Sequence, residues 1–267
     1  MKGKPVIAAL LFMAALLVFP SCSDAGLDEL YQNGEYENLL VICNENLTRK
    51  IDEDSVYYKM MCHYHLGQYD EAGRAALIYL SMYEEDGRHI NSALRILLYF
   101  SDDNEIRLNA GSRLCSSDAV RTNDLVSYYS VLMAEGYTEE AGSIYAQVRP
   151  ALSARDASMM CIASRSESTL IVSNLEAWHA ASGYSSEYHN ALLSAAGILL
   201  ARREGQLILP QLIEAYISSN DMQTALIIGD VYAQSGDSSR ASAYYNYAYA
   251  TYPDAALARL RALHLQS

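Results

Sequence analysis

The stretch VYAQSGDSSRASAYYNYAYATYPDAA (residues 231–256) places five tyrosines within nine residues and then reaches Pro253. Alanine, asparagine and threonine separate the tyrosines. Alanine is the strongest helix former and is depleted in strands. Ala241, Tyr245 and Ala248 are spaced three or four residues apart, so a helix would place them on one face. The stretch therefore predicts a helix that packs closely against a neighbour and ends before Pro253, which cannot continue it.

A turn precedes this helix at Gly236, since glycine readily adopts the left-handed conformation that ends a helix. Asp237 follows and can cap the next helix, where its charge also suits the positive end of the helix dipole. Residues 225–253 therefore predict two antiparallel helices joined by a tight turn. In this arrangement the tyrosines are mainly packing residues whose hydroxyls reach the rim.

The same pattern recurs along the chain. Gly67, Gly136 and Gly236 are each followed five residues later by alanine, and Gly34 lies 33 residues before Gly67. The separations of 69 and 100 residues are close to two and three periods of 34. Such a period indicates an array of stacked helical hairpins, each of which buries its apolar face against its neighbours.

The repeat resembles the tetratricopeptide family. Its conserved pattern of small and aromatic positions is matched, at the right spacings, by Ile228-Gly229, Tyr232, Gly236, Ala241, Tyr245, Ala248 and Pro253. Ala225 departs from the large residue that usually opens the pattern. The resemblance implies an all-α fold: a right-handed superhelical array of antiparallel helical hairpins, an α-solenoid.

The array is predicted to occupy residues 22–267, with about six to seven hairpins. The less regular periods predict turns near residues 101–103, 164–168, 205–210 and 218–221, and residues 150–205 have the least regular repeat. A closing helix is expected over residues 255–265, with Leu257 and Leu260 inward and Arg259 and Arg261 outward. No segment alternates with period two, so no sheet is expected.

The first 21 residues predict a signal peptide. Two lysines precede a 14-residue apolar run, which suits a secretory signal better than a membrane span. The run ends at Phe19-Pro20-Ser21-Cys22, which resembles the processing box of bacterial lipoproteins, although Phe19 and Pro20 depart from its usual residues. This resemblance implies cleavage before Cys22, acylation of Cys22 with chains such as palmitate, and a membrane-anchored domain in the cell envelope. Ordinary cleavage near Ser21 or Ser23, or an uncleaved anchor, are the alternatives.

The charge of the chain argues against polyanionic partners. The formal net charge is −13, and residues 1–21 contribute two lysines and no acid, so the remainder carries −15. A protein this acidic repels nucleic acid and anionic headgroups. The predicted contact with the membrane is therefore through the lipid alone.

The sequence offers little sign of catalysis or of a cofactor. It has no phosphate-binding glycine loop, nucleophile elbow or HExxH zinc motif. Cys62 and His65 share a helical face, but two ligands without a partner pair are a weak metal signal, and no metal site is predicted. Cys43, Cys62, Cys115 and Cys161 could form two disulfides or act as small apolar side chains, which their helical context favours. We expect no enzymatic activity and no cofactor.

A partner is expected in the concave groove, which first-helix residues line in the tetratricopeptide family. Carried onto the three clear repeats, the groove comprises Asp54, Tyr57, Met61, Tyr64, His65, Asn123, Val126, Ser130, Met133, Gln223, Leu226, Asp230 and Gln234. This mixture is amphipathic and partly acidic, so it predicts a protein or peptide segment of neutral or basic character. The favoured function is a lipid-anchored envelope scaffold. The alternative is a periplasmic helical module that binds a small ligand and associates with a transporter.

Overall fold

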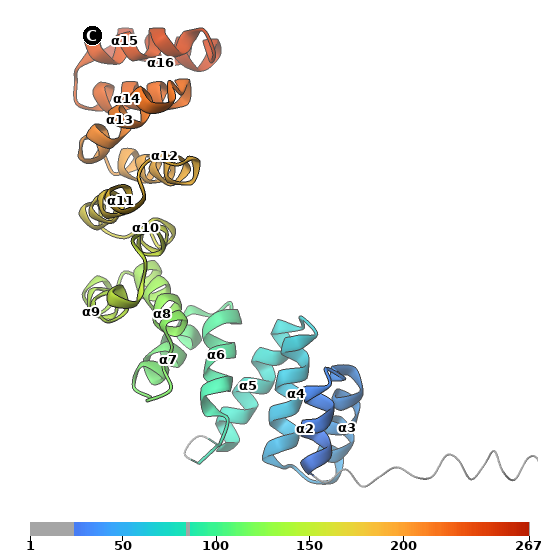
Figure 1. Ribbon diagram of the computed structural model, residues 1–267. Coiled ribbons are helices and arrows are strands. Elements are labelled where there is room, and N and C mark those ends of the chain that lie inside the picture. Colours follow the sequence, from blue (N-terminus) through green and yellow to red (C-terminus); the bar gives the residue numbers. More distant parts are fainter. Residues whose placement is uncertain (1–23, 84–85, 267) are drawn as a thin grey trace, which may run out of the picture. The chain divides into compact units, whose positions relative to one another are not determined.

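The computed structural model describes residues 24–83 and 86–266, and every regular element in these residues is helical (Figure 1). The contacts divide the chain into two units, Met1–Val120 and Arg121–Ser267, here called the N-terminal and C-terminal units. The predicted signal peptide and Cys22 lie outside the described residues. Within the described residues, no helix is both long and apolar enough to cross a membrane.

The described residues of the N-terminal unit form three helical hairpins. Each consists of a first and a second helix that follow one another in the chain, and each helix packs mainly on its sequence neighbours. In order, the pairs are α2 (Asp24–Gln32) with α3 (Tyr36–Arg49), α4 (Glu53–His65) with α5 (Tyr69–Tyr83), and α6 (Ile90–Phe100) with α7 (Asn104–Cys115).

The C-terminal unit contains four further hairpins and a closing helix. Short 3₁₀ turns, Arg149–Ala151 and Gly205–Ile208, follow α9 and α12. In order, the elements are α8 (Thr122–Glu135) with α9 (Thr138–Val148), α10 (Ala154–Ala163) with α11 (Ser168–Ser182), α12 (Ser186–Ala201) with α13 (Leu209–Ser219), α14 (Met222–Gln234) with α15 (Ser238–Tyr249), and α16 (Pro253–Gln266).

The predicted fold class is confirmed as an all-α, tetratricopeptide-like array of hairpins. Gly34, Gly67, Gly136 and Gly236 all have a positive φ, between 72° and 82°, as their place at hairpin turns requires. The less regular turns also fall where the sequence places them. For example, Asp103 caps α7 and Asp221 caps α14, each accepting hydrogen bonds from two backbone amides.

Arginine replaces glycine at two hairpin turns. Arg165 follows α10 and Arg203 follows α12, with φ values of 50° and 62°, in the place that Gly136 and Gly236 occupy in their hairpins. A left-handed conformation is costly for a residue with a Cβ. Because these turns have no glycine, the sequence between residues 150 and 205 shows the repeat pattern less clearly, although the hairpins are present there.

Arg203→Gly is therefore expected to stabilise the C-terminal unit by about 0.5–1 kcal/mol, because relief of the strained φ outweighs the added entropy of glycine in the unfolded chain. Urea unfolding of the full chain measures the change. Arg202→Gly is the control: Arg202 has an ordinary φ of −87°, and its guanidinium donates hydrogen bonds to the backbone. This variant should lose stability. A gain in both variants would contradict the strain argument.

Hydrogen bonds between residues one repeat apart connect successive hairpins. Arg202 donates to the Ser166 carbonyl (2.7 Å) and Gln234 donates to the Leu200 carbonyl (2.8 Å), at separations of 36 and 34 residues. Ser166 lies in the turn after α10 and Leu200 in the last turn of α12, where backbone carbonyls have no full set of helical partners. The polar contacts thus repeat with the period of the array.

In the closing helix α16, the side chain of Arg259 does not point outward as predicted. The guanidinium turns toward α14 and donates from Nε and Nη2 to both carboxylate oxygens of Asp230, at 2.7 and 2.9 Å. Tyr245 donates its hydroxyl to the same carboxylate. The prediction that Arg259 faces outward was wrong, because helical spacing alone does not reveal a carboxylate on the neighbouring helix that can accept a paired hydrogen bond.

Candidate binding surface on the first helices

The predicted groove residues of the N-terminal unit lie together along α4. Asp54, Tyr57, Met61 and Tyr64 are partly exposed, and His65 is exposed. Tyr57, Tyr64 and His65 belong to a larger set of rings on α2, α4 and α6, at the starts of α3 and α5, and just before α6. We call this set the aromatic face: Tyr31, Tyr36, Tyr57, Tyr58, Tyr64, His65, Tyr69, His89 and Phe100.

Ring contacts run across the aromatic face from the first hairpin to the third. His65 stacks on Tyr36 with centroids 4.4 Å apart, and its Nε2 lies 2.9 Å from the Tyr31 hydroxyl. Tyr31 contacts Tyr58 at 5.5 Å, and Tyr58 contacts Tyr57 at 5.1 Å. These rings join α2, the start of α3, and α4 into one continuous aromatic surface.

The aromatic face continues onto α6 at two points. Tyr57 stacks on His89, just before α6, with centroids 3.6 Å apart and an interplanar angle of 11°. Farther along, Tyr64 meets Phe100 at 5.6 Å, and Tyr69 stacks on Phe100 at 4.2 Å. The Tyr69 side of this pair is open, since that residue is 44 % exposed.

Carboxylates accompany the rings. Asp28 accepts a hydrogen bond from the Tyr58 hydroxyl at 3.2 Å. Asp54, only 17 % exposed, forms an ion pair with Arg88 and lies 4.0 Å from the His89 imidazole. Asp54 already has a cationic partner. Of these two carboxylates, Asp28 is therefore the more accessible to a cation of a binding partner.

Burial shapes the ionisation of the aromatic face. It raises the pKa of both Tyr31 and Tyr58 to about 12, with contributions from neighbouring tyrosines and, for Tyr58, from Asp28. It lowers the pKa of His65 and His89. At neutral pH the tyrosines are hydroxyl donors and the two imidazoles are uncharged. The face therefore offers aromatic surface, neutral donors and acid, a combination that suits cationic side chains.

The predicted groove residues of α8 in the C-terminal unit are moderately accessible. Asn123 is exposed, while Val126, Ser130 and Met133 are partly exposed. Ser130 donates its hydroxyl to the Val126 carbonyl in the same helix, so that donor is used internally. None of these four residues is aromatic.

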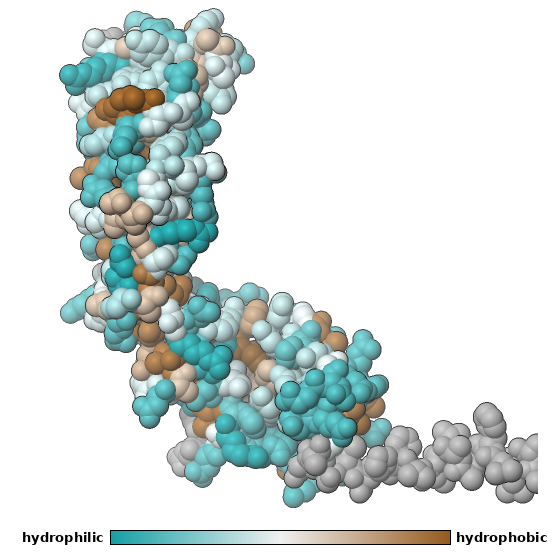
Figure 2. Space-filling model, in the orientation of Figure 1, coloured by the Kyte–Doolittle hydropathy of each residue, from teal (hydrophilic) through white to brown (hydrophobic). Residues whose placement is uncertain are grey.

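The predicted groove residues of α14 have mainly packing contacts. Leu226 is 6 % exposed and belongs to the core, so it offers no surface. Asp230 is bound by Arg259, and Gln234 bonds to the preceding hairpin; Gln223 is exposed. Figure 2 shows hydrophobic surface in the region of α13 and α14, and α13 carries Ile217, which is 76 % exposed.

Several residues of the aromatic face are not among the groove positions that the tetratricopeptide resemblance predicted. Tyr31 and Tyr58 lie on first helices, and Tyr58 is adjacent to the predicted Tyr57; His89 and Phe100 lie at the two ends of α6. The density of tyrosine and histidine from residue 31 to residue 100 was a usable signal. Which rings meet depended on the packing of three hairpins, so their contacts were not readable from helical spacing.

The cysteines and histidines make no metal cluster in the part of the chain that the structure describes. The four described cysteines, at positions 43, 62, 115 and 161, are free thiols. Burial raises the pKa of Cys43 and Cys62 to about 12, with Cys62 adding to the shift of Cys43. His63 forms a hydrogen bond with Gln68, and His65 forms one with Tyr31. The side chains from Cys62 to His65 therefore serve packing and hydrogen bonding.

Comparison with solved structures finds low overall similarity for the neighbour described here. The chain matches no protein family and no curated protein. A chain in the structure titled "Structure of Naa15/Naa10 bound to HypK-THB" is similar to it with 13 % identity and a TM-score of 0.29. The match covers 90 % of this chain and 39 % of that chain. The fold assignment therefore rests on the hairpins, turns and repeat contacts described above.

Proposed function

We propose that this protein is a helical-repeat scaffold that binds another protein through the aromatic face of its N-terminal unit. The observation that carries the proposal is the continuous set of partly exposed rings on α2, α4 and α6, accompanied by Asp28. Tyrosine is enriched among residues that dominate protein interfaces, because it combines a large contact area with a hydroxyl donor.

The preferred partner segment is neutral or basic. Aromatic rings attract lysine and arginine through their faces, and the nearby carboxylate adds Coulomb attraction. The chain's net charge of −13 favours encounter with a basic partner and disfavours an acidic one. A segment carrying arginine or lysine beside apolar residues fits both features.

The scaffold is further proposed to be a lipoprotein of the cell envelope, acylated at Cys22. This part rests on the apolar run and the Phe19–Cys22 stretch of the sequence. Two or more acyl chains would hold the acidic domain at a membrane without headgroup contacts.

Purification of the full-length protein from its own membranes in mild detergent, beside Cys22→Ala, tests the anchor. Mass spectrometry of the purified material identifies proteins that co-purify. Release of the wild type and the variant alike into the soluble fraction would exclude the anchor.

Tyr57→Ala combined with Tyr64→Ala is expected to weaken binding of the purified partner by about tenfold or more, as loss of interface tyrosines does. Calorimetric titration of the full chain measures the affinity. Tyr137→Ala combined with Tyr247→Ala removes two tyrosines of the C-terminal unit that are 52 % and 61 % exposed and should leave affinity unchanged. Circular dichroism of both variants checks that the helices persist. Equal affinities for the wild type and the Tyr57/Tyr64 variant would reject the aromatic face as the binding site.

A further inference from the structure

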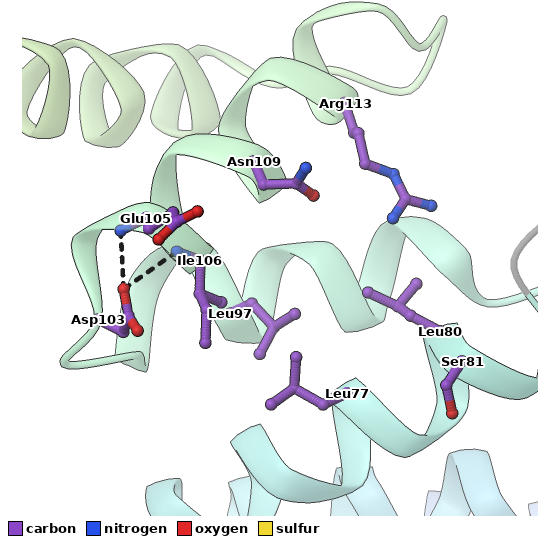
Figure 3. A pocket seen from close by; sticks show the side chains of 9 residues that line it. All are labelled: Leu77, Leu80, Ser81, Leu97, Asp103, Glu105, Ile106, Asn109 and Arg113. Carbon is purple, nitrogen blue, oxygen red and sulfur yellow. Dashed lines mark hydrogen bonds between the residues drawn. The ribbon is translucent and has the colours of Figure 1, made fainter.

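The N-terminal unit has a second surface feature, a pocket on the side of its second helices. It has a volume of about 360 Å³ and lies among α5, α6 and α7 (Figure 3). Helices α5 and α7 both pack on α6, but no substantial contact between α5 and α7 closes the space. The lining residues are Leu77, Leu80, Ser81, Leu97, Asp103, Glu105, Ile106, Asn109 and Arg113.

The pocket has an apolar floor that extends onto exposed surface. Leu80 and Leu97 are buried, and Leu77 from α5 converges on Leu97 and Ile106 in Figure 3 while remaining 43 % exposed. Immediately beside it, Ile78 and Met82 of α5 are 54 % and 43 % exposed. Ile78 and Met82 are four residues apart, so they share a face of α5 and add exposed apolar side chains near the pocket. Exposed apolar side chains that gather in this way mark interaction sites.

One end of the pocket is acidic. Asp103 caps α7, its Oδ1 accepting hydrogen bonds from the Glu105 amide at 2.8 Å and the Ile106 amide at 3.3 Å (Figure 3). The carboxylate of Glu105 is exposed beside it, and Asp102 is exposed in the preceding turn. An occupant therefore meets apolar side chains along α5 and negative charge at the start of α7.

We propose that this pocket binds an amphipathic helical segment of another protein, with aliphatic side chains on Leu77, Leu97 and Ile106 and a lysine or arginine opposite Asp103 and Glu105. Helices pack on one another through interlocking side chains, and α5 and α7 offer two helical walls with an apolar floor between them. The carboxylates of Asp103 and Glu105 favour a basic side chain at the start of α7, while Arg113 lies at the other end of the pocket. The pocket is lined mainly by the second helices α5 and α7, and none of its lining residues belongs to the aromatic face, so the two proposed sites can be tested separately.

A photo-crosslinking amino acid at position 77 tests the occupant in the full chain in its own cells. The expected product joins position 77 to an amphipathic segment of another protein that contains a lysine or arginine. The control carries the same crosslinker at position 217, in place of the exposed Ile217 of α13, and should not give this product. The proposal is overturned by a lack of any product beyond the control, or by products with lipid, a second copy of this chain or an acidic segment.

Charge exchange then tests the site itself with a synthetic peptide of the crosslinked sequence. Glu105→Lys should lower the affinity of the full chain for this peptide about tenfold, and exchange of the peptide's basic residue for glutamate should restore it. Glu71→Lys, a charge reversal at another second helix, should change the affinity less than twofold. Equal effects of the two substitutions, or none from either, would show that the acidic end does not contact the segment.

Discussion

Gly229→Ala is expected to lower the free energy of unfolding of the C-terminal unit by about 2 kcal/mol, although alanine normally stabilises a helix. A Cβ at position 229 would lie 2.4 Å from Cε1 of Tyr245. Tyr245 is 2 % exposed and its hydroxyl is bound to Asp230, so the ring cannot swing away without losing both packing and a hydrogen bond. Urea unfolding of the full chain, monitored by circular dichroism, measures the loss.

Gly197→Ala provides the matched control. Gly197 also lies inside a helix of the C-terminal unit, α12, but a Cβ there meets no atom within 4 Å. Its substitution should therefore raise stability by about 0.5–1 kcal/mol through helix propensity alone. In a Tyr245→Ala background, Gly229→Ala should lose its cost, because the methyl group would enter space that the ring has left. A persistent cost in that background would mean that the close approach is not its cause.

Glu53→Ala is expected to destabilise the N-terminal unit by about 2–3 kcal/mol, because it leaves the buried Tyr79 hydroxyl without its acceptor and removes the contacts to Arg88. The Glu53 carboxylate is 18 % exposed and accepts hydrogen bonds from the Tyr79 hydroxyl and from the Arg88 amide. Tyr79 is fully buried, and its hydroxyl also accepts from the His89 amide. The single carboxylate thus joins α4 to α5 and to the turn before α6.

The control for Glu53 is Glu71→Ala. Glu71 pairs with Arg74 on the surface of α5, with both side chains highly exposed, and such pairs contribute little to stability. The free energy of unfolding of Glu71→Ala should lie within about 0.5 kcal/mol of the wild type. A loss as large as that of Glu53→Ala would mean that any carboxylate removed from this unit has the same effect.

The Glu53 network also predicts acid sensitivity. Burial alone would raise the pKa of Glu53, but hydrogen bonds from Tyr79 and Arg88 outweigh it, and the pKa lies below its ordinary value of 4.5. The folded state therefore binds this proton less readily than the unfolded state. The stabilisation is present above pH 4.5 and is lost as the pH falls through the lower, folded-state pKa. Urea unfolding at several pH values should show a smaller acid-dependent loss in Glu53→Gln than in the wild type.

Much of the fold could be predicted because tetratricopeptide-like hairpins are specified by local residues. Gly67, Gly136 and Gly236 adopt the left-handed turns that their spacing predicted. The turns between residues 150 and 205 were harder to predict, because Arg165 and Arg203 adopt the left-handed conformation there in place of glycine. Hydrogen bonds such as that from Arg202 to the Ser166 carbonyl offset part of the conformational cost. Glycines mark the favourable turns in the sequence, whereas turns that tertiary contacts support carry no such residue.

The candidate site was predictable only in part. Tyr57, Tyr64 and His65 could be placed on an accessible helix face from the repeat register, and they do lie there. Their ring partners, such as His89 and Phe100, come from another hairpin. Asp230 illustrates the reverse case: it occupies a first-helix position, yet Arg259 and Tyr245 bind its carboxylate.

The sequence by itself therefore determined the helices, their turns and the order of the hairpins, because capping, glycine conformation and helical periodicity act over a few residues. Tertiary structure decided which polar and aromatic side chains remain available to a partner. Asp230 is bound by Arg259, 29 residues away, while the pocket beside Leu77 stays open because α5 and α7 pack on α6 and leave a space between them. Such outcomes depend on how whole helices pack, which no local pattern encodes.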